Sequence, residues 1–410
     1  MDASVNTLAA ARPAARSDSI AIPWFLYATI FGSASIVIGG IWDISWHRSI
    51  GRDTFWSPPH LAIYLGGVVA GLASAWVIFK TTFAGDPEER AAGVRIWGLR
   101  GPLGAFLCSW GAVAMLTSAP FDNWWHDAYG LDTKILSPPH VVLALGIIII
   151  QLGAMITALA LQNRHQSLTL ALAPAAPGSG GRDEPGPRLR RLRIMFVFAA
   201  GIVLVAIYLT MLEYMGRWFM HSSIFYRIGC AAYPALLVAA ARASGLRWPA
   251  AATAAVYMGT LALMLWVLPL FPAEPKLGPV RTQITHMVPL AFPLLLIAPA
   301  LAVDVLIRRW GPGRDWLLSV WLGVAFFLVF LGAQWAFANF LISPLARNYV
   351  FGAHYLPYFM SADGPYRFRF LNWDGSDAAL IKGLATAAGL AVVSSRIGLW
   401  WGNWMRRVQR

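Results

Sequence analysis

Residues 42–60 read WDISWHRSIGRDTFWSPPH, and this stretch indicates how the first part of the chain folds. An apolar run precedes it and another begins at Leu61, while its centre holds glycine and charged residues and its end is Ser-Pro-Pro-His. Serine is a preferred N-cap residue and proline is tolerated in the first turn of a helix, so a new helix is expected from Ser57. The stretch therefore predicts a tight hairpin between two long apolar helices.

The composition places such helices in a lipid bilayer. Of 410 residues, 58% are hydrophobic and 12% are charged, whereas soluble domains carry roughly 25% charged residues. A spanning helix needs about 20 apolar residues. We therefore expect an all-α, polytopic transmembrane helix bundle of about ten spans, which begin near Ile20, Leu61, Pro102, Val141, Ile194, Ile228, Trp248, Ile284, Trp316 and Ala378.

The hairpin pattern occurs twice. Residues 121–140 read FDNWWHDAYGLDTKILSPPH, 79 residues after the first copy. The copies share the Asp/His pair, a glycine, an Asp-Thr pair and Ser-Pro-Pro-His. This agreement predicts a tandem repeat of helix pairs in the first half of the chain.

A stretch rich in proline and glycine divides the chain into two halves, and we expect this linker to be disordered. His165 falls in it and is expected to be solvated. The predicted organisation is a cytoplasmic N-terminal tail 1–19, a four-span half 20–162 with the duplicated motif, a cytoplasmic linker 163–193, a six-span half 194–402 with a long outer loop 343–377, and a basic C-terminal tail 403–410.

The net charge of +13 is interpreted as membrane topology and not as nucleic-acid binding. If both termini lie on one side, that side receives 21 of the 32 Lys and Arg residues, and basic loops are typically cytoplasmic. We therefore expect a multi-pass protein of the inner (plasma) membrane, with both termini cytoplasmic and the motif loops on the periplasmic or outer side. Cys108 and Cys230 lie in different spans and indicate neither a disulfide framework nor a thiolate metal site.

The motif residues can form a metal site. Asp43 and His47 are four residues apart and share one helix face, and the hairpin brings His60 beside them. Two imidazoles and one carboxylate suit Zn, Cu, Fe or Ni and leave positions open for a substrate. The second copy offers the equivalent set, and other charged residues could orient the ligands from behind. The predicted ligands are Asp43, His47, His60, Asp122, His126 and His140, and the supporting residues are Arg48, Arg52, Asp53 and Asp132.

A simpler interpretation stands beside this one. Each loop can be a hydrogen-bonded cap at the membrane edge with tryptophan anchors. The duplication of Asp, His and His favours metal or proton chemistry over that interpretation. The second half holds only faint echoes, and we regard these residues, taken singly, as structural first and as site candidates second: Glu213, His221, His286 and His354.

The spacing Asp43-x3-His47-x12-His60, with Arg52-Asp53-Thr54 inside it, resembles the C subunit of the particulate methane and ammonia monooxygenases. The resemblance covers about 25 residues, doubled, and implies copper bound by Asp43, His47 and His60 near the periplasmic side of the membrane. The second copy departs from it, with Asp122-x3-His126-x13-His140 and Leu131 in place of the arginine. No segment is long enough for a cupredoxin-like domain.

Three functions follow as expectations. The first is a copper-dependent oxidoreductase of monooxygenase type, with iron or zinc as alternative metals, acting on a small or lipid-soluble substrate. The second is a metal or small-solute transporter. The third is a non-catalytic subunit or assembly factor of a membrane enzyme, and partner subunits or a homo-oligomer would accompany it. One shared metal site and two separate sites both fit the pattern.

Overall fold

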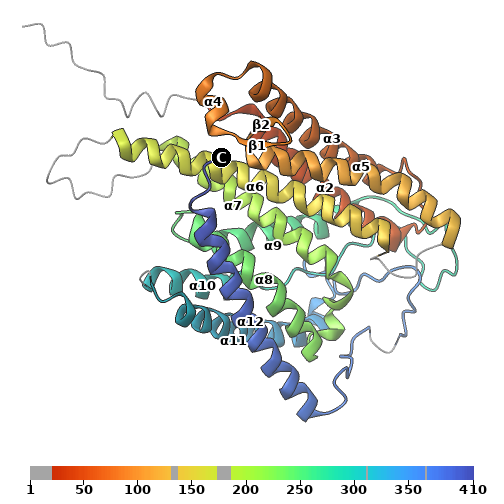
Figure 1. The fold of residues 1–410 in the computed structure, drawn as a ribbon. Coiled ribbons are helices and arrows are strands. Elements are labelled where there is room, and N and C mark those ends of the chain that lie inside the picture. Colours follow the sequence, from red (N-terminus) through yellow and green to blue (C-terminus); the bar gives the residue numbers. More distant parts are fainter. Residues whose placement is uncertain (1–20, 131–136, 173–185, 311–312, 365–366) are drawn as a thin grey trace, which may run out of the picture.

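A computed structural model describes residues 21–130, 137–172, 186–310, 313–364 and 367–410 (Figure 1). It confirms the predicted all-α helix bundle. The long helices are α2 (Trp24–Ser49), α3 (Pro58–Phe79), α5 (Leu103–Tyr129), α6 (Pro138–Leu172), α7 (Pro187–Thr210), α8 (Ser223–Ala243), α9 (Pro249–Val267), α10 (Ile297–Arg309), α11 (Asp315–Ile342) and α12 (Asp377–Met405).

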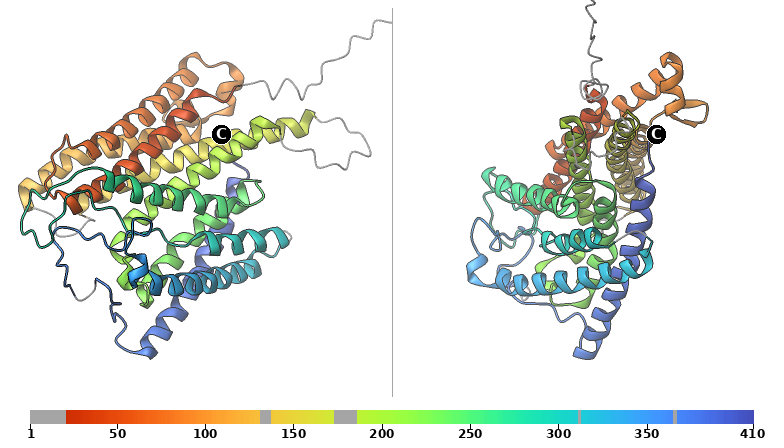
Figure 2. Two further views of the ribbon diagram at one scale, coloured as in Figure 1. Left: turned by 180° about the vertical axis from the view of Figure 1, so that it is seen from behind. Right: turned by 90° about the vertical axis from the view of Figure 1, so that its left-hand side faces the viewer.

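Short elements connect them. One loop holds a π-helical turn η1 (Lys80–Ala84), the helix α4 (Pro87–Ala92) and the hairpin of β1 (Val94–Ile96) and β2 (Leu99–Gly101). The 3₁₀ turns are η2 (Leu212–Tyr214), η3 (Arg217–Phe219), η4 (Leu268–Leu270) and η5 (Pro344–Ala346). Figures 1 and 2 show that α2, α3, α5 and α6 lie together on one side of the bundle and that the remaining helices lie on the other.

In the described part of the chain, nine helices are long and apolar enough to cross a membrane. The span expected from Ile284 differs from the prediction, because the chain there is non-helical up to Leu296 and only then forms the 13-residue helix α10. Pro289 and Pro293 explain the difference. A proline inside a helix removes a backbone hydrogen bond and clashes with the preceding turn, and two of them four residues apart prevent a helix.

The non-helical stretch is nonetheless buried from Met287 to Leu290 and again around Leu294. Backbone groups inside a membrane need partners within the protein, and three helices supply them here. Ser49 Oγ of α2 accepts the Val288 N–H at 2.7 Å. The Tyr257 hydroxyl of α9 accepts the Leu294 N–H at 3.3 Å, and Gln334 Oε1 of α11 accepts the Leu295 N–H at 3.0 Å. Side chains thus replace the missing helical bonds.

The tandem repeat extends through the helices. A Cβ atom added to Gly32 would lie 2.6 Å from the Gly66 carbonyl oxygen, and one added to Gly111 would lie 2.6 Å from the Gly146 carbonyl oxygen. The second pair of glycines follows the first by 79 and 80 residues. Helix α2 therefore crosses α3 at the same place, and as closely, as α5 crosses α6.

The motif loops and the long loops of the second half meet at one end of the bundle, named here the motif end. The Lys276 N–H donates to the Ile50 carbonyl at 2.9 Å, the Tyr358 N–H to the Arg48 carbonyl at 3.2 Å, and the Leu371 N–H to the Trp218 carbonyl at 2.8 Å. The first described helix and the last both have their free ends at the opposite end (Figure 1). The loop 343–377 therefore lies beside the hairpin that carries the first motif.

Part of the expected linker is helical. Helix α6 continues to Leu172 and α7 begins at Pro187, while residues 173–185 lie outside the described part. The expectation of a solvated His165 is wrong, since its exposed fraction is 4%. The reason is packing: Gln162 donates to the Ala243 carbonyl, and Asn163 donates to the carbonyls of Met405 and Val408.

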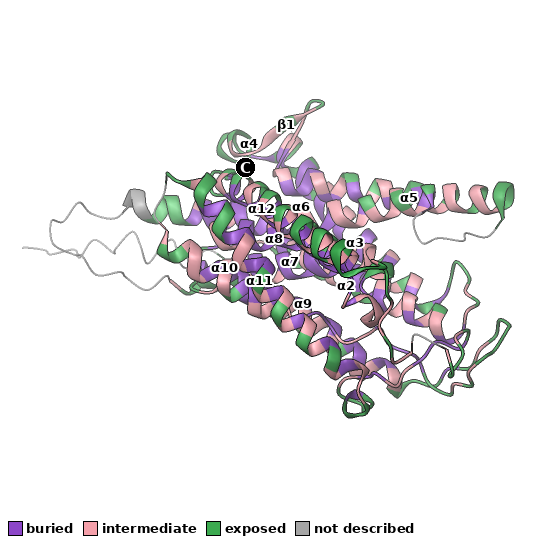
Figure 3. Cartoon of the chain, turned by 90° about the horizontal axis from the view of Figure 1, so that it is seen from below, coloured by how far each residue is buried: buried purple, intermediate pink, exposed green. Residues whose placement is uncertain are grey.

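The core lies in the second half of the bundle. Four tyrosines are fully buried there, and α7 is the most deeply buried of the spanning helices, whereas α5 keeps a broad exposed face (Figure 3). The tyrosines are Tyr208, Tyr226, Tyr233 and Tyr257. The four-helix repeat therefore lies at the edge of the molecule, with its motif loops at one end.

Candidate metal centre

Local backbone chemistry positions the first motif. The Ile50 and Gly51 N–H groups both bond to the Trp46 carbonyl, and Gly51 has φ of 86°, a left-handed conformation that glycine adopts without strain and that commonly ends a helix. The Trp46 indole N–H donates to the Arg52 carbonyl at 3.0 Å. The chain thus turns back immediately after His47.

The start of α3 differs in one detail from the prediction. Ser57 is the N-cap residue and Pro58 and Pro59 follow in the first turn, as expected. Its hydroxyl does not cap the helix, however, but accepts the Thr54 N–H of the preceding loop at 2.7 Å. This bond fixes the loop that faces His60.

Four side chains converge between the two helices. His60 Nε2 lies 3.1 Å from Asp43 Oδ1 and 3.4 Å from Asp53 Oδ2. His47 Nε2 lies 3.3 Å from Asp53 Oδ2 and 3.9 Å from Asp43 Oδ1. The ligand atoms of Asp43, Asp53 and His60 all lie within 4.8 Å of one another. The predicted convergence of Asp43, His47 and His60 is present, and Asp53 joins it.

The ring orientation of His60 suits metal binding. Its Nδ1 lies 2.9 Å from the Thr54 carbonyl oxygen, which can only accept a hydrogen bond. In a neutral ring Nδ1 therefore carries the proton, and the lone pair of Nε2 faces Asp43 and Asp53. A backbone carbonyl that fixes the tautomer in this way is a regular companion of metal-binding histidine.

The donor set fits a cation. Asp43 Oδ1 is buried, and the ring nitrogens of His60 and His47 lie 3.1 and 3.9 Å from it. Ligands at about 2.0–2.2 Å from a tetrahedral metal lie roughly 3.3–3.6 Å apart, which is close to the distances of 3.1 and 3.4 Å from His60 Nε2 to Asp43 and Asp53. Nitrogen and carboxylate oxygen are donors that Zn, Cu and Fe accept.

The two histidines also affect Asp53, which lies in the loop between the helices. Its hydrogen bond from His47 holds the pKa of the Asp53 carboxyl below its ordinary value, and the charge of His60 acts in the same direction. Asp53 is therefore an anionic donor at neutral pH.

The second motif has the same arrangement, but its His140 and Asp122 side chains are more exposed than the equivalent His60 and Asp43. His126 Nε2 and His140 Nε2 each lie 3.5 Å from Asp122 Oδ1, and that oxygen is buried. His126 Nδ1 lies 2.9 Å from the Gly130 carbonyl, and Gly130 has φ of 82°. Side-chain exposure is 38% for His140 and 34% for Asp122, against 21% and 23% for His60 and Asp43. Asp132 lies outside the described residues.

The predicted supporting arginines point elsewhere. Among the described residues, neither Arg48 nor Arg52 forms an ion pair with the motif carboxylates. Arg48 is the neighbour of His47 in sequence, but its charge acts on Tyr208 in α7 and on Arg217. Arg52 is exposed.

The remaining candidates do not belong to the group of Asp43, Asp53 and His60. His221 is stacked between Trp335 and Phe370, with ring centroids 4.0 and 3.6 Å away. His286 is exposed, and its Nδ1 atom lies 2.9 Å from the Thr285 hydroxyl oxygen. Glu213 is exposed in the turn η2. His354 stacks on Tyr355 at 4.1 Å.

Two features escaped the sequence argument. Asp53 was expected behind the ligands and lies among them, and its place in the internal Arg-Asp-Thr was the available signal. A group of arginines around Phe368 also gathers at the motif end. The run Arg367-Phe368-Arg369 was the signal in the sequence that could have indicated this group.

No family model, no curated protein and no solved structure matches this chain. The resemblance to the monooxygenase C subunit therefore rests on the motif residues alone.

Proposed function

We propose that this membrane protein binds a metal ion at Asp43, Asp53 and His60, with His47 as a further ligand or as the group that orients Asp53. The observation that carries the proposal is the convergence of these side chains around the buried Oδ1 atom of Asp43. The resemblance of the motif to the monooxygenase C subunit favours copper, with iron and zinc as alternatives.

We further propose that the site serves an oxidoreductase of monooxygenase type. A bound redox metal with an open position would supply the chemistry of oxygen activation. The protein contributes two carboxylates that balance the charge of the cation and a histidine whose free nitrogen is fixed toward it. The ligands lie near the end of the spanning helices, and their exposure of 21–47% leaves room for a small or lipid-soluble substrate.

Elemental analysis with electron paramagnetic resonance tests this function. Purified wild-type protein, grown with metal supplied, is compared with His60→Ala and His140→Ala. Loss of about one metal per variant indicates two sites, and loss of all metal from either variant indicates one shared site. Wild-type protein without copper, iron or zinc above background would overturn the proposal.

A transport function is the second candidate, and one observation favours it. The stretch 286–296 is non-helical and leads into the half-length helix α10, and discontinuous spans of this kind surround the binding sites of many transporters. Metal uptake into vesicles that is abolished by His60→Ala would favour transport over catalysis. Uptake equal to that of empty vesicles would exclude it.

We place the motif end on the periplasmic or outer side of the inner (plasma) membrane, with both termini in the cytoplasm. The distribution of Lys and Arg supports this orientation. A cysteine introduced at exposed Trp56, in a variant without the two native cysteines, should react with an impermeant thiol reagent in intact cells. Labelling only after lysis would reverse the assignment.

A further inference from the structure

Four arginines gather at the motif end. The guanidinium carbons of Arg347, Arg367 and Arg217 lie 3.6, 5.0 and 5.5 Å from the centroid of the Phe368 ring. Arg48, at the end of α2, is the fourth, because its carbonyl accepts the Tyr358 N–H of the loop 343–377 at 3.2 Å. Three separate parts of the chain thus bring like charges together: the end of α2, the turn η3 and the loop 343–377.

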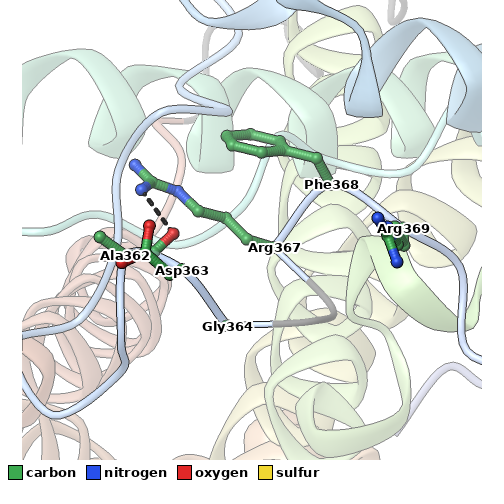
Figure 4. Close-up of a pocket in the computed structure, with 6 residues that line it drawn as sticks. All are labelled: Ala362, Asp363, Gly364, Arg367, Phe368 and Arg369. Carbon is green, nitrogen blue, oxygen red and sulfur yellow. Dashed lines mark hydrogen bonds between the residues drawn. The ribbon is translucent and has the colours of Figure 1, made fainter.

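These arginines lack counterions. Among the described residues, none of the four has a carboxylate oxygen within ion-pair distance, whereas Arg242 at the opposite end pairs with Asp315 at 3.2 Å. Asp363 lines a cavity of about 420 Å³ together with Arg367 and Phe368, but it is exposed (Figure 4). The group therefore carries an uncompensated positive charge.

The donors of the group are only partly used. Arg367 donates to the Ala362 carbonyl at 3.0 Å (Figure 4). Arg367 also donates to the His354 carbonyl at 3.3 Å, and Arg217 donates to the Ala353 carbonyl at 2.6 Å. The Nε atoms of Arg48, Arg217 and Arg367 are buried and have no hydrogen-bond partner in the described part of the chain. The carbonyl groups orient the guanidinium groups, but because they are neutral they do not compensate the positive charge.

The charge is costly where it lies. Burial, followed by the charges of Arg367, Arg48 and Arg347, lowers the pKa of Arg217 to about 10. The group still carries its proton at neutral pH. Desolvated like charges repel one another strongly, so a protein that keeps such a group gains stability when an anion joins it.

We propose that Arg48, Arg217, Arg347 and Arg367 form a binding site for a phosphate-type oxyanion, either free phosphate or the phosphate of a lipid headgroup. Guanidinium groups match phosphate oxygens in a planar, bidentate geometry. Several cations without acidic partners fit a multiply charged, tetrahedral anion, which can meet more than one arginine at once. The site does not depend on the proposed metal, although Arg48 follows His47 directly in the chain.

The test is thermal unfolding of the full chain in a non-ionic detergent with a metal chelator present. The chelator ensures that phosphate does not act through a bound metal. One arm adds sodium phosphate and the other adds phosphatidylglycerol, each against sodium chloride at matched ionic strength. Stabilisation by phosphate alone identifies the free ion, stabilisation by the lipid alone identifies a headgroup, and stabilisation by both identifies the shared chemistry.

Arg347→Gln is the main variant because Arg347 is exposed and its loss should not prevent folding. It should weaken the apparent affinity about tenfold, as expected for one charge-assisted bond. Arg217→Gln should weaken it at least as much, and exposed Arg227→Gln of α8 should leave it unchanged. No stabilisation of the wild type in either arm, or equal stabilisation of Arg347→Gln and the wild type, would overturn the proposal.

Discussion

The two copies of the helix pair are alike inside the bundle and differ at the motif end. Both crossings rest on paired glycines, Gly32 with Gly66 and Gly111 with Gly146. Both motifs place two imidazoles at a buried aspartate oxygen. Among the described residues, a second carboxylate joins the cluster only in the first motif, where it is that of Asp53, and the histidine at the start of the helix is less exposed there.

The two copies thus share the close packing of their helices but differ in the surroundings of their donor side chains. Crossing distance depends on glycines in the helices, whereas the completeness of a donor set depends on a few loop residues. We therefore expect the first copy to bind metal more tightly than the second. The following predictions test that expectation, from the largest expected effect to the smallest.

Replacing His60 should have the largest effect. His60→Ala removes the nitrogen that faces both carboxylates, and we expect metal affinity at the first site to fall by more than about 100-fold, because even partners behind the ligands contribute 10–100-fold. Isothermal titration with Zn²⁺ or Cu²⁺ measures this. His140→Ala is the matched variant and should leave the tighter binding phase intact; equal losses in the two variants would contradict an inequality between the copies.

Removing Asp53 should weaken the first site. Asp53→Ala should weaken metal binding about 10–100-fold, since a negatively charged donor is lost from the cluster. The same titration detects the change. Asp127→Ala, which changes an exposed aspartate in the second motif, serves as the control. If Asp53→Ala leaves the metal affinity unchanged, Asp53 is not a ligand and only supports the ligands.

The glycine pairs should respond equally in both copies. In Gly66→Ala the new methyl group would lie 2.4 Å from the Gly32 carbonyl oxygen, and in Gly146→Ala it would lie 2.8 Å from that of Gly111. Overpacking of this kind costs about 1–3 kcal/mol, which thermal unfolding in detergent can resolve. Gly259 in α9 has open space around it, so Gly259→Ala should not destabilise. A loss confined to one copy would show that the crossings are not equivalent.

The smallest effect concerns the loop behind His60. Ser57→Ala removes the hydroxyl that holds Thr54, and a neutral hydrogen bond is worth about 1 kcal/mol, so metal affinity should fall by roughly fivefold. The equivalent Ser137 Oγ is buried and makes no hydrogen bond with the residues that the structure describes. Ser137→Ala should therefore leave affinity unchanged, and similar results for both serines would remove the loop bond from the explanation.

The sequence predicted what depends on local pattern. Apolar runs located the spanning helices, and Ser57 with its two prolines located the start of α3. The i, i+4 spacing of Asp43 and His47 placed both side chains on one face. The sequence failed where distant segments decide the structure. Proline interrupts the run from Ile284, but the run is held inside the bundle by Ser49, Tyr257 and Gln334.

Long-range packing also explains the other differences. His165 is buried because the neighbouring Gln162 and Asn163 bind carbonyl groups up to 245 residues away. The arginine group is assembled from positions 48, 217, 347 and 367, and no window of the sequence contains all of them. The periodicity of the sequence cannot predict such contacts, since they depend on which helices lie next to one another in the folded bundle.

The non-helical crossing has a consequence for biosynthesis. Its backbone cannot enter the lipid alone, because its N–H groups rely on side chains of other helices. One of these, Gln334, is synthesised 39 residues after Leu295. The ribosome must therefore have made α11 before this stretch can take its final place, and the eighth passage through the bundle is completed after the ninth has been synthesised.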